Sequence, residues 1–135
     1  MSDRFFDTNV LLYLLSADEA KANRAEAELT VGGIISVQVL NEFAAVATRR
    51  LKMPLDDVRE TLLVIRNVCT VVPLTEETHD LGMHIVQKNL LSIYDAMIVA
   101  AALQAGCKLL VSEDMHHSQI FEKTLKVHNP FQEPG

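Results

Sequence analysis

Residues 4–15 read RFFDTNVLLYLL, and this stretch decides the fold of the chain. Arg4–Phe6 has the aromatic, apolar character of a short buried strand. Asp7-Thr8-Asn9 follows at once, and these residue types favour a turn or the start of a helix. In open parallel sheets the ligand crevice lies beyond the carboxyl ends of the strands, so residues directly after a strand are candidates for a functional site.

Short apolar runs and longer helical patterns alternate along the rest of the chain. Further strands are predicted at Gly33–Ile35, Cys69–Pro73, Lys108–Val111 and Leu125–His128. Helices are predicted between them, at Asp18–Leu29, Val37–Leu51, Asp56–Asn67, Glu76–Asn89 and Ile93–Ala105. We therefore expect an α/β fold in three layers, α/β/α, around a mostly parallel central sheet of about five strands.

Helix boundaries carry local signals as well. Ser16 with Glu19 and Ser92 with Asp95 have the spacing of a capping box, in which the first side chain accepts from an amide and the second bonds back. Gly106 is expected to end the last predicted helix in a left-handed cap.

Length and composition predict one compact domain. A chain of 135 residues has the size of one domain, and 49% hydrophobic residues with only 5 Gly and 4 Pro supply a core and exclude a disordered chain. The sequence contains no repeat or linker, so one domain is expected over residues 1–131, with a C-terminal tail at 132–135.

Apolar runs and cysteines indicate the compartment. The longest apolar runs, Val10–Leu15 and Ala96–Leu103, are far shorter than the roughly 18 residues that cross a bilayer, and no signal peptide precedes the first strand. We expect a cytoplasmic protein without a membrane segment. Cys69 and Cys107 have no CxxC spacing, so buried reduced thiols are expected.

The charge balance has two interpretations. With 18 acidic against 12 basic residues, the formal net charge is -6, which argues against a protein that coats nucleic acid through clustered Lys and Arg. Carboxylates that converge on one pocket would instead bind hard cations, and these cations would supply positive charge.

Four acids occupy positions where such convergence is expected. Asp7 follows the first strand, and Asp114 closely follows Leu109–Val111, so both should emerge at one edge of the sheet. Asp95 begins a nearly all-apolar helix, and Glu42 falls at the edge of an apolar helical stripe, which predicts that it is half-buried.

Each acid also has an ordinary structural explanation. Asp7 and Asp114 could be turn residues, Asp95 a capping residue and Glu42 a solvated helix acid. As a set, however, four carboxylates at one edge repel each other unless a cation is present. A set of oxygen ligands without His or Cys selects Mg²⁺ or Mn²⁺ over zinc.

In these segments the chain resembles PIN-domain ribonucleases, in particular the VapC-type toxins of toxin–antitoxin pairs. The resemblance covers nearly the whole chain and rests on Phe6-Asp7-Thr8-Asn9, Asn41-Glu42-Phe43, Tyr94–Ala102 and Leu110–Asp114. It implies a PIN-like fold in which the acids Asp7, Glu42, Asp95 and Asp114 bind Mg²⁺ or Mn²⁺. It also implies that Asn9 and Ser112 orient this acidic set.

By the same resemblance the expected reaction is metal-dependent hydrolysis of RNA by an endoribonuclease, leaving 5′-phosphate and 3′-hydroxyl ends. The implied partner is a small antitoxin that covers the active site. Val10–Leu15 and the helix Asp56–Asn67 carry more apolar residues than a small sheet obviously needs, so a homodimer or an antitoxin groove is expected there, with ordinary core burial as the alternative.

Other polar residues carry weaker signals. Arg49 and Lys52 belong to the densest basic group and are candidates to contact the RNA backbone, although a solvated helix end explains them equally well. His116 and His117 could contact substrate phosphate or bind a softer metal, but solvated loop residues are the preferred interpretation, because no third soft metal ligand accompanies them. With 5% aromatic residues and no Trp, a platform for stacking bases is not evident.

Two other functions use parts of the same pattern. A PIN-type module that binds RNA or protein with weak or no nuclease activity remains the alternative, since a fold does not guarantee catalysis. A receiver-like phosphoacceptor domain would need paired acids on its first strand, whereas Asp7 is single.

Overall fold

The computed structural model describes residues 2–132 and contains a six-stranded sheet in the order β3-β2-β1-β4-β6-β5. The strands are β1 Arg4–Phe6, β2 Gly33–Ser36, β3 Cys69–Val72, β4 Leu109–Val111, β5 Ile120–Phe121 and β6 Leu125–His128. Every neighbouring pair is parallel except β5 and β6. The predicted α/β class and mostly parallel sheet are confirmed, with six strands where about five were expected.

The additional strand is β5, which pairs antiparallel with β6 at the edge of the sheet. It has only two residues, so it has no alternation that a sequence pattern could detect. The chain reverses after it at Glu122 and Lys123, which have φ of 49° and 65°. Neither is a usual turn residue, so the hairpin has no sequence signal.

The helices are α1 Thr8–Leu12, α2 Glu19–Val31, α3 Val37–Arg49, α4 Leu55–Val68, α5 Glu76–Lys88 and α6 Ile93–Gln104, with the 3₁₀ turn η1 at Tyr13–Leu15. The five predicted helices are all present, within two residues at each end. Helix α1 and η1 were not predicted, because Val10–Leu15 is apolar at every position and has no helical period.

The capping predictions had mixed outcomes. The Ser16–Glu19 box is wrong: Asp18 caps α2 by accepting from the amides of Ala20 and Lys21. Ser92 caps α6 as predicted. Gly106, with φ of 75°, follows that helix in the left-handed conformation, as predicted.

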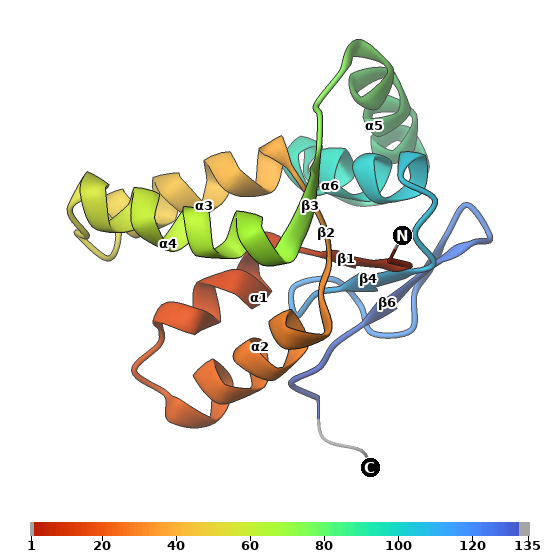
Figure 1. Cartoon of the computed structure of the whole chain (residues 1–135). Helices are drawn as coiled ribbons and strands as arrows, with labels where there is room; N and C mark the ends of the chain where they lie inside the picture. The colour runs from red at the N-terminus through yellow and green to blue at the C-terminus, as the bar shows by residue number, and fades with distance from the viewer. Residues whose placement is uncertain (1, 133–135) are drawn as a thin grey trace.

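The helices pack around the strands in layers. In Figure 1, α5 and α6 lie on one side of the central strands and α2 lies on the other. Helix α1 leaves the end of β1 and packs against α3, while η1 packs against α2. Strand β1 therefore ends where α1 begins, with Asp7 as the N-cap of α1. The first residue of α1, Thr8, bonds to Glu42 of α3.

The core explains why α6 has no amphipathic pattern. All residues from Ala96 to Ala102 are buried, because the helix packs between α5, α3 and the sheet. Beneath it, β1 and β4 contribute Phe5, Phe6, Leu110 and Val111, all fully buried. The two ends of α6 reach the surface, and the first turn carries Asp95.

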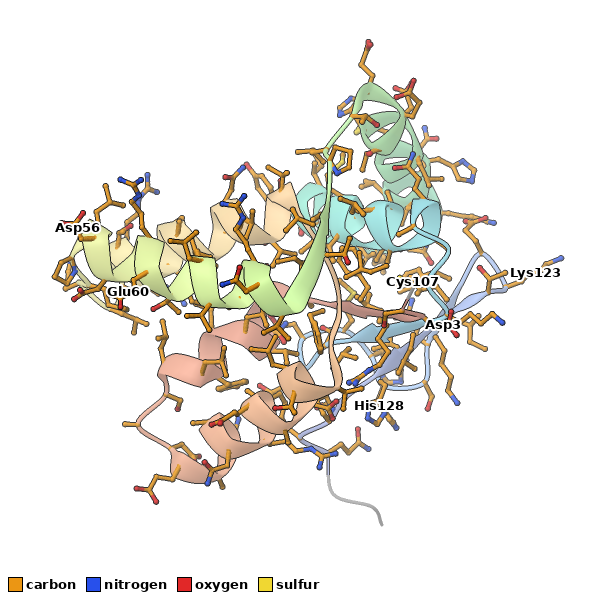
Figure 2. All side chains as sticks on the ribbon, viewed as in Figure 1. Asp3, Asp56, Glu60, Cys107, Lys123 and His128 are labelled. Atoms are coloured by element: carbon orange, nitrogen blue, oxygen red, sulfur yellow. The ribbon has the colours of Figure 1, made fainter. Side chains whose placement is uncertain are left out.

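The two thiols are free and buried, as predicted. Burial raises the pKa of both Cys69 and Cys107 to about 11. The carboxylate of Asp3, beside Cys107 in Figure 2, adds to the shift of the second thiol. Both groups are therefore protonated and poor nucleophiles at neutral pH.

Val10–Leu15 and Asp56–Asn67, for which either an interface or core burial was expected, differ in their exposure. Val10 and Leu11 are buried, so core burial accounts for them. On α4, Val58 and Ile65 are buried. Four other apolar residues of this helix are about half exposed: Leu55, Leu63, Val64 and Val68. Figure 2 shows Asp56 and Glu60 at the outer end of the same helix.

Within residues 2–132 no single helix has the length and hydropathy to cross a membrane; α5 and α6 together, with a bend of 118° between them, meet that test by length and composition. Of the predicted C-terminal tail, residues 133–135 lie outside the described part of the chain.

Candidate functional site

Two parallel strands bring Asp7 and Ser112 together. Phe6 at the end of β1 pairs with Val111 at the end of β4, so the residue after each strand lies at the same edge. The Asp7 amide donates to the Val111 carbonyl at 2.9 Å, and the Ser112 hydroxyl donates to Asp7 Oδ2 at 2.7 Å. The predicted crevice beyond the strand ends is thus present in the structure.

Asp7 is the most buried of the four acids, with 3% of its surface exposed. Its carboxylate also accepts from the Thr8 amide at 2.7 Å and from Asn9 Nδ2 at 3.1 Å. Burial nevertheless raises the pKa of Asp7 to about 7, and the charges of Asp95 and Glu42 contribute to the rise. The site therefore holds a carboxylate whose charge is costly without a nearby cation.

Glu42 lies on α3 and is half-buried, as the helical stripe predicted. It accepts from the Thr8 hydroxyl at 3.3 Å and from Gln38 Nε2 at 3.4 Å. Burial raises its pKa, with further contributions from Asp95 and Asp114.

Asp95 lies in the first turn of α6, where its amide donates to the Ser92 hydroxyl at 3.1 Å. The reciprocal bond of a capping box, from the Ser92 amide to the Asp95 carboxylate, is absent from the described chain, so that part of the prediction is wrong. Burial raises the pKa of Asp95, and the charge of Asp114 adds to it.

Asp114 differs from the other three because it is exposed. It lies in the bend after β4, and its carboxylate makes no hydrogen bond to any residue between 2 and 132. Its charge still reaches Glu42 and Asp95, because it raises the pKa of both.

All four acids line one pocket of about 570 Å³. Asn9 and Thr8 complete its polar end, and Ser112 lies behind Asp7, where it bonds to that carboxylate. The rest of the lining is mostly apolar and includes Leu12, Leu15, Ala45, Val46 and Leu51. Four segments that are far apart in the sequence therefore contribute one carboxylate each to a single cavity.

Arg50, which was not among the predicted RNA contacts, is the basic residue in the described lining of this pocket. Arg50 lines the pocket, whereas Arg49 and Lys52 are outside the lining. The pocket follows the face of α3 that carries Val46, and Arg50 comes four positions later, one turn further along that face.

The two histidines after Asp114 also lie outside the pocket lining. His116 is exposed, as expected for a loop residue. His117 is half-buried: its Nδ1 accepts from the Asn129 amide at 3.0 Å, and its ring centre lies 5.7 Å from that of His128. Its described contacts therefore join the loop to the end of β6.

The donor set fits a hard divalent cation. The four acids offer oxygen only, and the pocket lining contains no His or Cys among the described residues, which favours Mg²⁺ or Mn²⁺ over zinc. Within residues 2–132, no three His, Cys, Asp or Glu side chains are close enough to form a metal site as they stand. Ligation by several of these acids therefore requires side-chain rotation toward a common point.

Comparison with known proteins gives a family match. The model of the PIN domain matches residues 4–122. No curated protein matches the chain.

Similar solved structures include a toxin–antitoxin complex from Klebsiella pneumoniae, with a TM-score of 0.72 and 19% identity over 96% of this chain and 99% of that one. A DNA-bound VapBC complex from Salmonella typhimurium has a TM-score of 0.70 and 14% identity, over 96% and 99% of the two chains. The toxin VapC20 of Mycobacterium tuberculosis, described as cleaving the sarcin–ricin loop, has a TM-score of 0.66 and 18% identity, over 79% and 86%. At these identities the likeness shows a common fold.

Proposed function

The chain belongs to the PIN domain family, and on that premise we propose that it is a Mg²⁺- or Mn²⁺-dependent endoribonuclease, the toxin of a toxin–antitoxin pair. One observation carries the proposal: four carboxylates from four separate elements line the same pocket. A cluster of like charges costs stability unless a counter-charge is bound, so its assembly favours a cation site. This local cluster also accounts for four of the 18 acidic residues, which leaves 14 against 12 basic residues elsewhere.

The residues have distinct roles in this proposal. Asp7 is the central metal ligand, with its orientation held by Asn9 and Ser112. Asp95 and Glu42 approach from helices α6 and α3, and Asp114 from the bend after β4. When bound among these acids, Mg²⁺ or Mn²⁺ would neutralise phosphate charge and lower the pKa of the attacking water.

The remaining pocket lining suits a nucleic acid strand. Arg50 lines the pocket, and in this proposal it pairs with a phosphate that flanks the scissile bond. A water occupies about 30 Å³, so a six-water Mg²⁺ complex would fill less than half of the 570 Å³ pocket. The apolar side chains Leu12, Leu15, Val46 and Leu51 then leave room for a nucleotide beside the acids.

The partner assignment rests on two supports. Several similar structures are described as toxin–antitoxin complexes, which favours an antitoxin partner for this chain. The exposed apolar residues of α4, including Leu63 and Val64, supply surface for an antitoxin or for a second copy of the chain in a homodimer.

The nuclease is tested by incubating the purified protein with RNA in Mg²⁺, in Mn²⁺ and in EDTA. We expect cleavage only with the metals, and a loss of at least about 100-fold in Asp7→Asn and Asp95→Asn. Asp80→Asn is the matched control, because Asp80 is exposed on α5 outside the pocket. Metal-dependent cleavage that persists equally in both site variants would contradict the assignment, and RNA binding without cleavage would support the binding-module alternative.

The toxin role has a separate test. We expect expression of the wild-type chain to arrest growth of its host and Asp7→Asn to relieve the arrest. Co-expression of the product of a short neighbouring reading frame should also relieve it and should co-purify with the chain.

A further inference from the structure

Four side chains from four separate segments meet at the edge of the acidic pocket: Tyr13 of η1, Lys21 of α2, Glu113 after β4, and Phe131 near the C-terminus. Of these, Tyr13 also lines the pocket. The Tyr13 hydroxyl donates to Glu113 Oε1, and Lys21 Nζ lies 3.2 Å from Glu113 Oε2 and 3.1 Å from the Tyr13 oxygen. The same ammonium lies 4.5 Å from the Tyr13 ring centre and 5.7 Å from that of Phe131. We refer to Tyr13, Lys21 and Glu113 as the clasp.

The clasp is held in place by aromatic packing. The rings of Tyr13 and Phe131 make an edge-on contact with centres 4.7 Å apart and an interplanar angle of 63°. The Lys21 ammonium therefore lies near two aromatic rings and is paired with a carboxylate, although 38% of its side chain is exposed. Such a combination fixes a side chain that would otherwise be mobile.

Glu113 is fixed through its main chain too. Its amide donates to Asn9 Oδ1 at 3.0 Å, and Asn9 Nδ2 donates in turn to Asp7 Oδ2 at 3.1 Å. The Glu113 side chain is thus held by Tyr13 and Lys21, and its main chain by Asn9, which also contacts Asp7. Asp114 is the next residue, and its own carboxylate has no hydrogen-bond partner in residues 2–132, so its position depends on the peptide before it.

The clasp also determines which acids face the pocket. Glu113 is next to Asp114, yet it is outside the pocket lining because both of its carboxylate oxygens bond to Tyr13 and Lys21. Lys21 compensates its charge. Without this pair, a fifth unpaired carboxylate would lie beside the four acids of the pocket.

We propose that the clasp is a positioning device that holds the Glu113–Asp114 bend, so that Asp114 faces the pocket while Glu113 is kept out of it. Its consequence for metal binding rests on the proposed function. The residues act through Asp114 and do not themselves bind the ion. Residues that orient a metal ligand typically affect metal affinity or activity by about 10- to 100-fold.

Two variants test the clasp without changing net charge. Tyr13→Phe removes one hydroxyl and keeps the ring, and the double variant Lys21→Met with Glu113→Gln removes the ion pair. The control is Lys88→Met with Glu122→Gln, because Lys88 and Glu122 form a comparable pair, at 3.5 Å, away from the pocket. Because the net charge is unchanged, the total charge of the protein cannot account for an altered affinity for cations.

We expect both clasp variants to bind Mn²⁺ about tenfold more weakly by electron paramagnetic resonance, and to lower kcat for RNA more than they raise KM. Amide hydrogen exchange over residues 112–117 should accelerate in both variants. The control pair should leave all three measurements at the wild-type values.

Each contrary result has a distinct meaning. Unchanged exchange over residues 112–117 in both clasp variants would overturn the proposal. Faster exchange with unchanged Mn²⁺ affinity and kcat would also overturn it, because the clasp would then serve folding alone. If the wild-type protein and Asp7→Asn both failed to bind Mn²⁺, the proposed function would fail, and the exchange measurement would still decide whether the clasp holds the bend.

Discussion

The Ser112 hydroxyl donates a 2.7 Å hydrogen bond to Asp7 Oδ2, and the two residues are 105 positions apart in the sequence. This bond lowers the pKa of Asp7 and so opposes the larger effect of burial. The bond also holds Oδ2 in place, and this restricts the direction in which Oδ1 can point. Ser112, which lies outside the pocket lining, therefore orients Asp7 and makes its pKa lower than burial alone would.

Ser112→Ala should weaken Mn²⁺ binding by about tenfold at pH 7, because Asp7 loses a donor and its pKa rises further. Isothermal titration calorimetry measures the affinity directly. Ser112→Thr retains the hydroxyl and should bind Mn²⁺ more tightly than the alanine variant. Equal affinity of all three proteins would show that Asp7 does not depend on this bond.

Asp7 should make the metal-free protein less stable as the pH rises. Its pKa is 3.8 in a model compound and about 7 in the folded chain, so between these values the folded state binds more protons than the unfolded state. The free energy of unfolding must then fall through this range and level off above about pH 7. Urea titrations in EDTA from pH 4.5 to about 8 should show the decline, and Asp7→Asn should flatten it.

Divalent cations should offset the loss of stability that follows ionisation of Asp7, and this effect should depend on pH. Under the proposed function, protons and metal would compete for the same carboxylates, and the pKa values of Asp7, Glu42 and Asp95 are raised. Excess Mn²⁺ should therefore raise Tm more at about pH 8 than at about pH 5.5. A Tm shift of the same size at both pH values would argue against binding at these acids.

Arg50 and Arg49 offer a paired test of RNA contact. Arg50 lines the pocket and Arg49 does not, so Arg50→Ala should weaken RNA binding more than Arg49→Ala does. It should also reduce the slope of log affinity against log salt concentration by about the amount expected for one phosphate contact. Fluorescence anisotropy at several salt concentrations, with an uncleaved RNA in EDTA, separates binding from catalysis. A larger effect of Arg49→Ala would favour the contact expected from the sequence.

Gly33→Ala should destabilise the fold. A Cβ at Gly33 would lie 2.6 Å from a carbon of the Phe6 ring and 3.1 Å from the Arg4 carbonyl oxygen, and Phe6 is fully buried. The ring has little room to move, so we expect a loss of about 1–3 kcal/mol in urea unfolding. Since Phe6 precedes Asp7, weaker Mn²⁺ binding should accompany the loss. Gly106→Ala is the comparison, because the space around Gly106 is open and its positive φ alone opposes a side chain.

Local patterns were enough to predict the five longer strands, the five longer helices and the four acids that meet in the pocket. A strand end, a helical stripe and a buried helix with one acid at its start are each properties of a short segment. The clasp could not be predicted in this way, because Lys21 and Glu113 are 92 positions apart and each resembles an ordinary surface charge. The same applies to Arg50, whose position depends on how α3 packs against α1.

The strand order has a consequence for the chain as it is synthesised. Strand β1 is made first but lies inside the sheet, between β2 and the much later β4. Asp7 therefore leaves the ribosome long before β4 and the bend that carries Asp114 exist. A nascent chain that stops ahead of β4 lacks the β1–β4 pairing and Asp114, because long-range strand pairing must wait for the distant partner. The acidic pocket is therefore complete only after Asp114, late in the 135-residue chain, has been translated.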